Sequence, residues 1–427
     1  MIKASTLISQ LETDTYNSTL LDIDPDNTRL EYEKNRYINA CRRFIGTWGD
    51  CPVSVFSAPG RSEICGNHTD HQYGEVLACS INRDAIAVAA PREDCIVQVI
   101  SDDQPLIELR TDSLEQDERE YGTTKALIKG VLRGIADRKR NIGGFNCFVT
   151  SDVLIGAGLS SSAAFETIIG TVINGFYNDM KIKPVDIAKI GQFAENDFFG
   201  KPCGLMDQMA CSLGSLVHID FADPDNPEIE QLAFDLSSYD MSLCITDTKG
   251  SHSDLTADYA AVPEEMTSVA RYFGEEHLRN VPPAALYNNI ARVREQCGDR
   301  AVLRALHFYA ESRRVRQLVQ AIKDNDIASF LNGIQASGDS SFKYLQNVYT
   351  IHDTAHQNVS LALCASDRVL CNNKGAARVH GGGFAGTIQA FVRNDAVNEY
   401  RSEMNYLFGE GACSILKIRK YGGIRVV

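Results

Sequence analysis

The sequence has no apolar run long enough to cross a bilayer, no C-x-x-C pair and no excess of positive charge. Its first residues turn polar and acidic too early for a signal peptide. Lysine and arginine number 42 against 56 aspartates and glutamates, a net charge of −14, which argues against nucleic acid or an anionic membrane as the main partner. Thirteen scattered cysteines are typical of reduced thiols. We therefore expect a cytoplasmic protein whose ligands are small molecules.

The composition that remains is that of an ordinary globular protein, with 44% apolar and 23% charged residues. A length of 427 residues predicts more than one core. Strand patterns at 53–61, 76–81, 85–90 and 96–100 precede any long helix, which predicts an α+β lobe built on a mixed or antiparallel sheet. The first of these strands is expected to break at its Pro-Gly pair. Because the pattern changes near residue 240, we expect lobes at 1–240 and 241–427.

The most informative stretch lies at 151–164, where Gly156 and Gly158 precede three serines, Ser160 to Ser162. An alternating strand pattern comes before it, and a long apolar segment without proline follows as a helix would. A glycine-bearing turn that opens a helix directs free backbone N–H groups and the helix dipole at one spot, which suits phosphate. No lysine follows the second glycine, so this is not the P-loop pattern. The alternative is a small-residue loop that only caps a buried helix.

Two further stretches carry side chains suited to chemistry. Arg61, His68 and Asp70 lie within ten residues in a polar segment framed by glycines, a mixture that can hold a hydroxyl-rich ligand such as a sugar. Glu195 ends a helical pattern, and Asp207 follows twelve residues later in a bend flanked by glycine. Two carboxylates near a phosphate loop suit phosphoryl transfer, one for Mg²⁺ and one for the attacking hydroxyl. The alternatives are a solvated turn and two surface acids.

A third glycine-rich segment, Gly381 to Gly386, has four glycines in six residues before an expected strand at 387–392. Together with 59–74 and 156–163, it resembles the three signature motifs of the GHMP small-molecule kinases. The first motif is most similar to the galactokinase signature, G-R-x-N-L-I-G-E-H-T-D-Y, and the stretch 194–208 matches the galactokinase pattern as well. The resemblance covers most of 53–260 and 304–392.

This resemblance implies a two-lobed α+β fold with the active site in the cleft between the lobes. It implies an ATP- and Mg²⁺-dependent phosphotransferase that acts on the anomeric hydroxyl of galactose or a close relative. Asp207 would be the catalytic aspartate and Arg61 the arginine that keeps it ionised. The other implied residues fall into four groups: Gly156, Gly158, Leu159, Ser160, Ser161, Ser162 and Ala163 on ATP; Ser161, Ser162 and Glu195 on Mg²⁺; His68, Asp70, Gly204 and Tyr259 on the sugar; Gly381, Gly382 and Gly383 closing over sugar and phosphate.

The chain departs from the galactokinase signature at Asn67, where the family has glutamate, and at Glu63, where it has asparagine. Asn67 is uncharged and can donate as well as accept, so the preferred sugar can differ, and Glu63 can supply a carboxylate from a neighbouring place. Both are candidate substrate-binding residues. Three alternatives stay open: a kinase for an amino sugar or a pentose, a non-catalytic regulator that binds sugar and ATP, and a metabolite-binding protein without nucleotide. The sequence does not indicate an oligomeric state.

Overall fold

The computed structural model describes residues 1–153, 158–250 and 255–427. A nine-stranded sheet is built from residues 2–232 and from the chain end, in the order β1-β2-β3-β6-β4-β5, with β13 added beside β2 and the β7–β8 pair beside β3. Its strands are β1 (Ile2–Lys3), β2 (Pro52–Cys65), β3 (Glu75–Pro91), β4 (Ile96–Ser101), β5 (Ile107–Arg110), β6 (Phe145–Ser151), β7 (Leu216–Asp220), β8 (Glu228–Leu232) and β13 (Ile424–Arg425). All pairings are antiparallel except β4 with β6.

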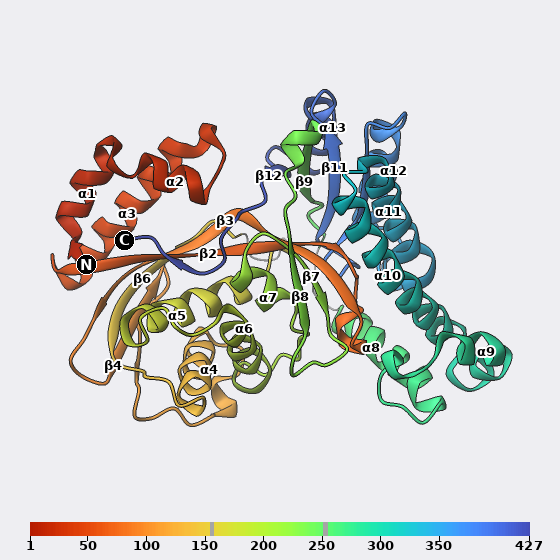
Figure 1. The fold of residues 1–427 in the computed structure, drawn as a ribbon, viewed down its shortest axis with the longest axis horizontal. Helices are drawn as coiled ribbons and strands as arrows, with labels where there is room; N and C mark the ends of the chain where they lie inside the picture. Colours follow the sequence, from red (N-terminus) through yellow and green to blue (C-terminus); the bar gives the residue numbers. More distant parts are fainter. Residues whose placement is uncertain (154–157, 251–254) are drawn as a thin grey trace.

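Helices cover both faces of this sheet (Figure 1). On one face lie α1 (Ala4–Glu12), α2 (Asn17–Ile23) and α3 (Leu30–Trp48). On the other lie α4 (Thr124–Asp137), α5 (Ser161–Tyr177), α6 (Pro184–Phe193), which continues as a π-helical turn at Ala194–Phe198, and α7 (Met206–Leu213). Successive strand residues point to opposite faces, so Val53 and Val55 of β2 pack against the first helices while Phe56 and Ala58 pack against the second group.

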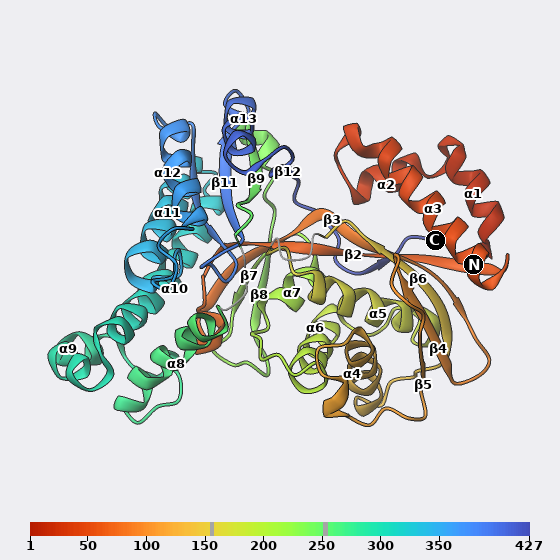
Figure 2. The ribbon, with the colours of Figure 1, turned by 180° about the vertical axis from the view of Figure 1, so that it is seen from behind.

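A second, four-stranded antiparallel sheet has the order β10-β11-β9-β12. Its strands are β9 (Met241–Asp247), β10 (Gly375–His380), β11 (Thr387–Arg393) and β12 (Cys413–Leu416). The helices of this half are α8 (Thr256–Tyr272), α9 (Pro283–Cys297), α10 (Asp299–Lys323), α11 (Ile327–Ser340), with a π-helical turn at Ser341–Leu345, α12 (Asn358–Leu370) and α13 (Val397–Phe408). Seen from behind, α10, α11 and α12 stand beside this sheet (Figure 2). The expected class, α+β with mixed and antiparallel sheets, is confirmed.

The chain end returns to the first sheet, where β13 pairs with β2. A core of apolar side chains from both halves, including Ile64, Leu77, Leu243 and Phe391, joins the two sheets. The division at residue 240 therefore stays a prediction. None of the helices in the described parts of the chain has the length and apolar content that a bilayer crossing requires.

The break expected at Pro59 and Gly60 is wrong, because β2 continues to Cys65. The pairing register with β3 shifts between Pro59 and Arg61, so the Pro-Gly pair forms a bulge instead of an end. Glycine is needed there, since a Cβ at Gly60 would lie 2.8 Å from the Leu159 carbonyl oxygen. The two strands expected at 76–81 and 85–90 are likewise one strand, β3. The bulge places Arg61 in contact with the glycine-bearing turn at 158–160.

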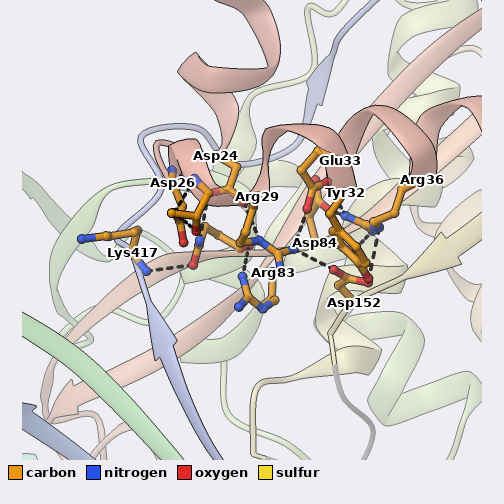
Figure 3. A network of polar contacts seen from close by, with 12 residues as sticks. Asp24, Asp26, Arg29, Tyr32, Glu33, Arg36, Arg83, Asp84, Asp152 and Lys417 are labelled. Atoms are coloured by element: carbon orange, nitrogen blue, oxygen red, sulfur yellow. Dashed lines mark hydrogen bonds and ion pairs between the residues drawn. The ribbon is translucent and has the colours of Figure 1, made fainter. Parts of the chain in front are cut away.

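A network of buried and half-buried charges holds α3 and the turn before it against the centre of the first sheet (Figure 3). Arg36 bonds Asp84 of β3 at 2.9 Å, and Arg29 bonds Asp152 at 2.9 Å. Arg419, from the returning chain end, bonds the other carboxylate oxygen of Asp84 at 2.9 Å. Because Asp152 directly follows β6, the network lies at the base of the loop that precedes α5.

Candidate active site

An ion pair between Arg61 of β2 and Asp207 of α7 lies at the centre of the candidate site. Arg61 Nε and Nη2 donate to the two Asp207 oxygens at 2.7 and 2.8 Å, a bidentate geometry. The Arg61 side chain is 6% exposed and that of Asp207 is 33% exposed, so the carboxylate is the more open partner. Burial opposes ionisation, but the Arg61 charge and its hydrogen bonds outweigh it and hold the pKa of Asp207 below its ordinary value. Asp207 is therefore a carboxylate at neutral pH.

The glycine-serine loop lies directly against this pair. The carbonyl oxygen of Gly158 accepts a hydrogen bond from Arg61 Nη1, and that of Leu159 accepts one from the Arg61 backbone N–H at 3.1 Å. Ser160 has φ 60° and ψ 60°, the left-handed conformation, and its hydroxyl donates to Asp207. Helix α5 begins at the next residue, so its first N–H groups, at Ser161, Ser162 and Ala163, open beside the aspartate. The expected ATP contact at Gly156 lies outside the described residues.

Glu195, on the π-helical turn after α6, lies at the start of α5. Its carboxylate accepts hydrogen bonds from Ser162 Oγ at 3.1 Å, Lys201 Nζ at 3.0 Å and Gln208 Nε2 at 2.9 Å. Gln208 Nε2 also donates to Glu166 at 3.2 Å, and burial together with the Glu195 charge raises the pKa of Glu166 well above its ordinary value. Within 1–153, 158–250 and 255–427 no cluster of three carboxylate, imidazole or thiol side chains could hold a metal ion.

No motif assigned a role to Lys201, Gln208 or Glu166. The one local signal is spacing, because Glu166 follows Ser162 by four residues and so shares its helix face.

Two of the expected sugar residues, Asp70 and Gly204, lie against each other. A Cβ at Gly204 would lie 1.8 Å from an Asp70 carboxylate oxygen, so only glycine lets the carboxylate take this place. Both residues line a pocket of about 210 Å³ whose walls include Tyr73, Gln192 and Cys203. The fold therefore brings Asp70 of the first motif and Gly204 of the stretch 194–208 to one pocket, and Gly204 lies three residues before Asp207 in the chain.

Glu63 and Asn67 face the core, at 2% and 1% exposure. Asn67 Nδ2 lies 3.1 Å from both Glu63 oxygens, and Arg378 of β10 bonds Glu63 at 2.8 Å. Burial raises the pKa of Glu63, against the opposing charge of Arg378. His68 has φ 59°, and burial together with His71 lowers its pKa to about 3, so its ring is neutral. Substrate contacts by these residues stay predictions.

The third glycine motif meets the second. A Cβ at Gly381 would lie 3.8 Å from the Gly158 oxygen, and one at Gly382 would lie 2.8 Å from the Tyr259 ring. His380, directly before the motif, shares a hydrogen bond with Ser62 at 3.0 Å. The glycine-bearing segments of the three motifs thus lie near Arg61 and Asp207, although more than two hundred residues separate the first motif from the third.

A protein built on two joined sheets, with a serine-rich helix start, an arginine-aspartate pair and a third glycine-rich loop at one site, has the architecture of a small-molecule kinase. Residues 126–215 match the GHMP kinases N terminal domain, and residues 42–91 match the galactokinase galactose-binding signature. A galactokinase of Glaesserella parasuis is 31% identical over 84% of this chain and 90% of its own length, and one of Streptomyces coelicolor is 29% identical over 83% and 89%.

The fold is shared with solved structures too. A Lactococcus lactis galactokinase complexed with galactose has a TM-score of 0.77 at 22% identity, over 90% of this chain and 98% of its own. A Methanococcus jannaschii mevalonate kinase has a TM-score of 0.61 at 15% identity, over 86% and 98%. The chain belongs to the galactokinase family of GHMP kinases, as the three motifs predict. Members of this family are phosphotransferases that act on a hydroxyl group.

Proposed function

We propose that this protein transfers the γ-phosphoryl group of ATP to the anomeric hydroxyl of galactose or a close relative, giving the sugar 1-phosphate and ADP. The observation that carries the proposal is the ionised Asp207, held by Arg61 and Ser160 at the start of the glycine-serine loop. A carboxylate 33% exposed beside the first N–H groups of α5 can meet a hydroxyl and a phosphate at once. The pocket beside Asp70 and Gly204 supports a sugar-sized acceptor.

In this reaction Asp207 accepts or orients the proton of the attacking hydroxyl, and Arg61 keeps the carboxylate ionised. The N–H groups at the start of α5 and the serine hydroxyls take the phosphate oxygens. Gly381 to Gly383 cover the sugar and the transferred group. Asp70, Gly204, His68 and Tyr259 hold the sugar hydroxyls.

Residues Ser162 and Glu195 fit a magnesium ion. Their oxygen atoms lie 3.1 Å apart, both are the hard donors that Mg²⁺ prefers, and Ser161 adjoins them at the helix start. One or two protein ligands together with phosphate oxygens are the usual magnesium set in kinases. When bound, Mg²⁺ would neutralise charge on the γ-phosphoryl group. Lys201 shares the Glu195 carboxylate and adds a positive charge on the same side.

A panel of free sugars with ATP and Mg²⁺ tests the proposal, with ADP release as the readout. We expect the highest kcat/KM for galactose or a close relative, and no release with the corresponding 1-O-methyl glycoside, which lacks the anomeric hydroxyl. Release that persists with the glycoside would refute the site of transfer. The thirteen free cysteines favour a reducing, cytoplasmic setting.

A kinase for a different sugar, an amino sugar or a pentose, is the second candidate, and Asn67 favours it. Its amide is buried and bonded to Glu63, Gly381 and Asn347, so the position that is glutamate in the galactokinase signature offers no carboxylate to a sugar. The same panel decides between the two candidates, since a preference of tenfold or more for another sugar would replace galactose.

A further inference from the structure

The three carbonyl groups of the loop Gly381–Gly383 are each held by a side chain from outside the loop. The first accepts from Asn67 Nδ2 at 2.7 Å, and the third accepts from the Tyr259 hydroxyl at 2.8 Å. The second lies 3.0 Å from His68 Nε2 and 3.1 Å from Asn347 Nδ2. A carbonyl only accepts, so the neutral His68 ring carries its proton on Nε2. We call the four side chains the glycine-loop clamp.

Asn347 is the member of the clamp that no sequence motif marks. It follows the π-helical turn after α11 and is fully buried, and Gln346 before it has φ 56° in the left-handed region. Its side chain holds the second loop carbonyl, while its backbone oxygen accepts from the Phe384 N–H at 2.5 Å. A Cβ at Gly383 would lie 2.0 Å from that oxygen, so the loop and Asn347 are packed in direct contact. Asn347 therefore holds the loop at its centre and at its end.

The clamp is tied to the sugar-signature turn through an amide pair. Asn347 Nδ2 donates to Asn67 Oδ1 at 2.7 Å, and Asn67 Nδ2 donates to Glu63 and to the first loop carbonyl. Glu63 is paired with Arg378 of β10, the strand that runs directly into the loop. The contacts therefore connect β10 to the loop, the loop to Asn347 and Asn67, and Asn67 through Glu63 back to Arg378 of β10. The side chains of Glu63, Asn67, Asn347 and Arg378 are buried, so a hydrogen bond lost among them leaves a partner that water does not reach, whereas Gly382 of the loop is exposed.

The loop in turn borders the catalytic pair. The Cβ position of Gly381 is 3.8 Å from the oxygen of Gly158, and the same oxygen accepts from Arg61, which holds Asp207. A shift of the loop by about 1 Å would therefore disturb the groups that meet the phosphoryl group, a displacement that can cost about 10²-fold in rate.

We propose that Asn347 is a positioning residue of this enzyme, fixing the loop Gly381–Gly383 against the sugar-signature turn so that the loop stands over the acceptor and the phosphoryl group. The inference rests on the proposed function for its catalytic consequence and on the contacts alone for the clamp itself. Asn347 touches neither reacting group and acts through the loop.

Asn347→Asp tests the clamp, because it keeps the size of the side chain and replaces the amide N–H groups with a carboxyl oxygen that can donate at most one of the two hydrogen bonds. We expect kcat to fall 10- to 100-fold, with KM for ATP and for the sugar within about threefold of wild type. We also expect amide hydrogen exchange at 381–384 to be faster by about tenfold or more. Asn347→Ala gives the same readouts without a new carboxyl group and serves as the second variant.

Asn174→Asp is the matched control. Asn174 is a buried asparagine near the C-terminal end of α5, the end opposite the glycine-serine loop, and it holds the backbone of Ile182 through bonds of 2.9 and 3.0 Å. It should lower Tm while kcat and the exchange at 381–384 stay as in wild type. Unchanged exchange in both Asn347 variants would overturn the clamp whatever the turnover, and faster exchange with unchanged kcat would overturn its positioning role. Wild-type protein that phosphorylates no sugar would refute the proposed function, while hydrogen exchange would still decide the clamp.

Discussion

Replacing Asp207 by asparagine should separate catalysis from folding at the centre of the site. The amide keeps the shape of the carboxylate and one acceptor for Arg61, but it has no negative charge and cannot take a proton from a hydroxyl. Loss of a general base costs about 10²- to 10⁴-fold in kcat, or roughly 3–5 kcal/mol of transition-state stabilisation. We expect at least ~10²-fold, with KM for ATP changed little because the glycine-serine loop is intact.

The same substitution changes the pH dependence of stability. The folded-state pKa of Asp207 is depressed, so its ionisation contributes stability that is present above the unfolded pKa of about 3.9 and is lost as pH falls through the folded pKa. Asp207→Asn lacks this contribution, because it loses a charge-assisted bond to Arg61 worth about 1.5–3 kcal/mol. The difference in unfolding free energy between wild type and variant should therefore be largest at neutral pH and shrink below pH ~4.

Turnover is measured by ADP release and stability by urea unfolding at several pH values. Asp94→Asn is the matched control, because Asp94 accepts a bidentate pair of hydrogen bonds from Arg92 at 2.7 and 2.6 Å in the turn between β3 and β4, beyond the end of β3 that is opposite the sugar-signature turn. It should keep full turnover. Retained kcat in Asp207→Asn would refute the proton role, and a stability difference independent of pH would refute the assignment of Asp207 as the ionised partner of Arg61.

Three further substitutions test other parts of the structure. Gly204→Ala places a Cβ 1.8 Å from an Asp70 oxygen, so we expect KM for the sugar to rise about tenfold or more while KM for ATP stays constant; equal effects on both would contradict a sugar pocket here. Glu195→Gln removes the charge beside Ser162, so kcat should require a higher Mg²⁺ concentration, and an unchanged Mg²⁺ titration would remove Glu195 from the metal site. Arg378→Met leaves the buried Glu63 without its ion-pair partner and should lower the free energy of unfolding by about 3–5 kcal/mol in urea titrations; a loss under about 1 kcal/mol would show that the pair does not hold the two sheets.

The sequence predicts the parts of the site that depend on local chemistry. Gly158 and Ser160 mark a turn that opens a helix, and Asp207 lies in a bend flanked by glycine; these features have short-range signals. The resemblance to known kinases places Arg61 opposite Asp207, although 146 residues separate them. The α+β class follows from strand patterns that precede the long helices.

Long-range contacts carry no such signal. Pro59 and Gly60 have the composition of a strand end, but β2 passes through them because the bulge fits beneath the Leu159 carbonyl, a tertiary contact. Asn347 and Asn67 are 280 residues apart, and each alone is an ordinary asparagine. Their pairing comes from the meeting of the two sheets, which no spacing in the chain encodes.

The attachment of α3 to Asp84 and Asp152 has a practical consequence for anyone who shortens this protein. Removing the first fifty residues would remove Arg29 and Arg36, the ion-pair partners of Asp152 and Asp84. It would also expose the apolar side of β2 and β3 to water. The remaining polypeptide would expose this apolar surface, and we expect it to aggregate during expression.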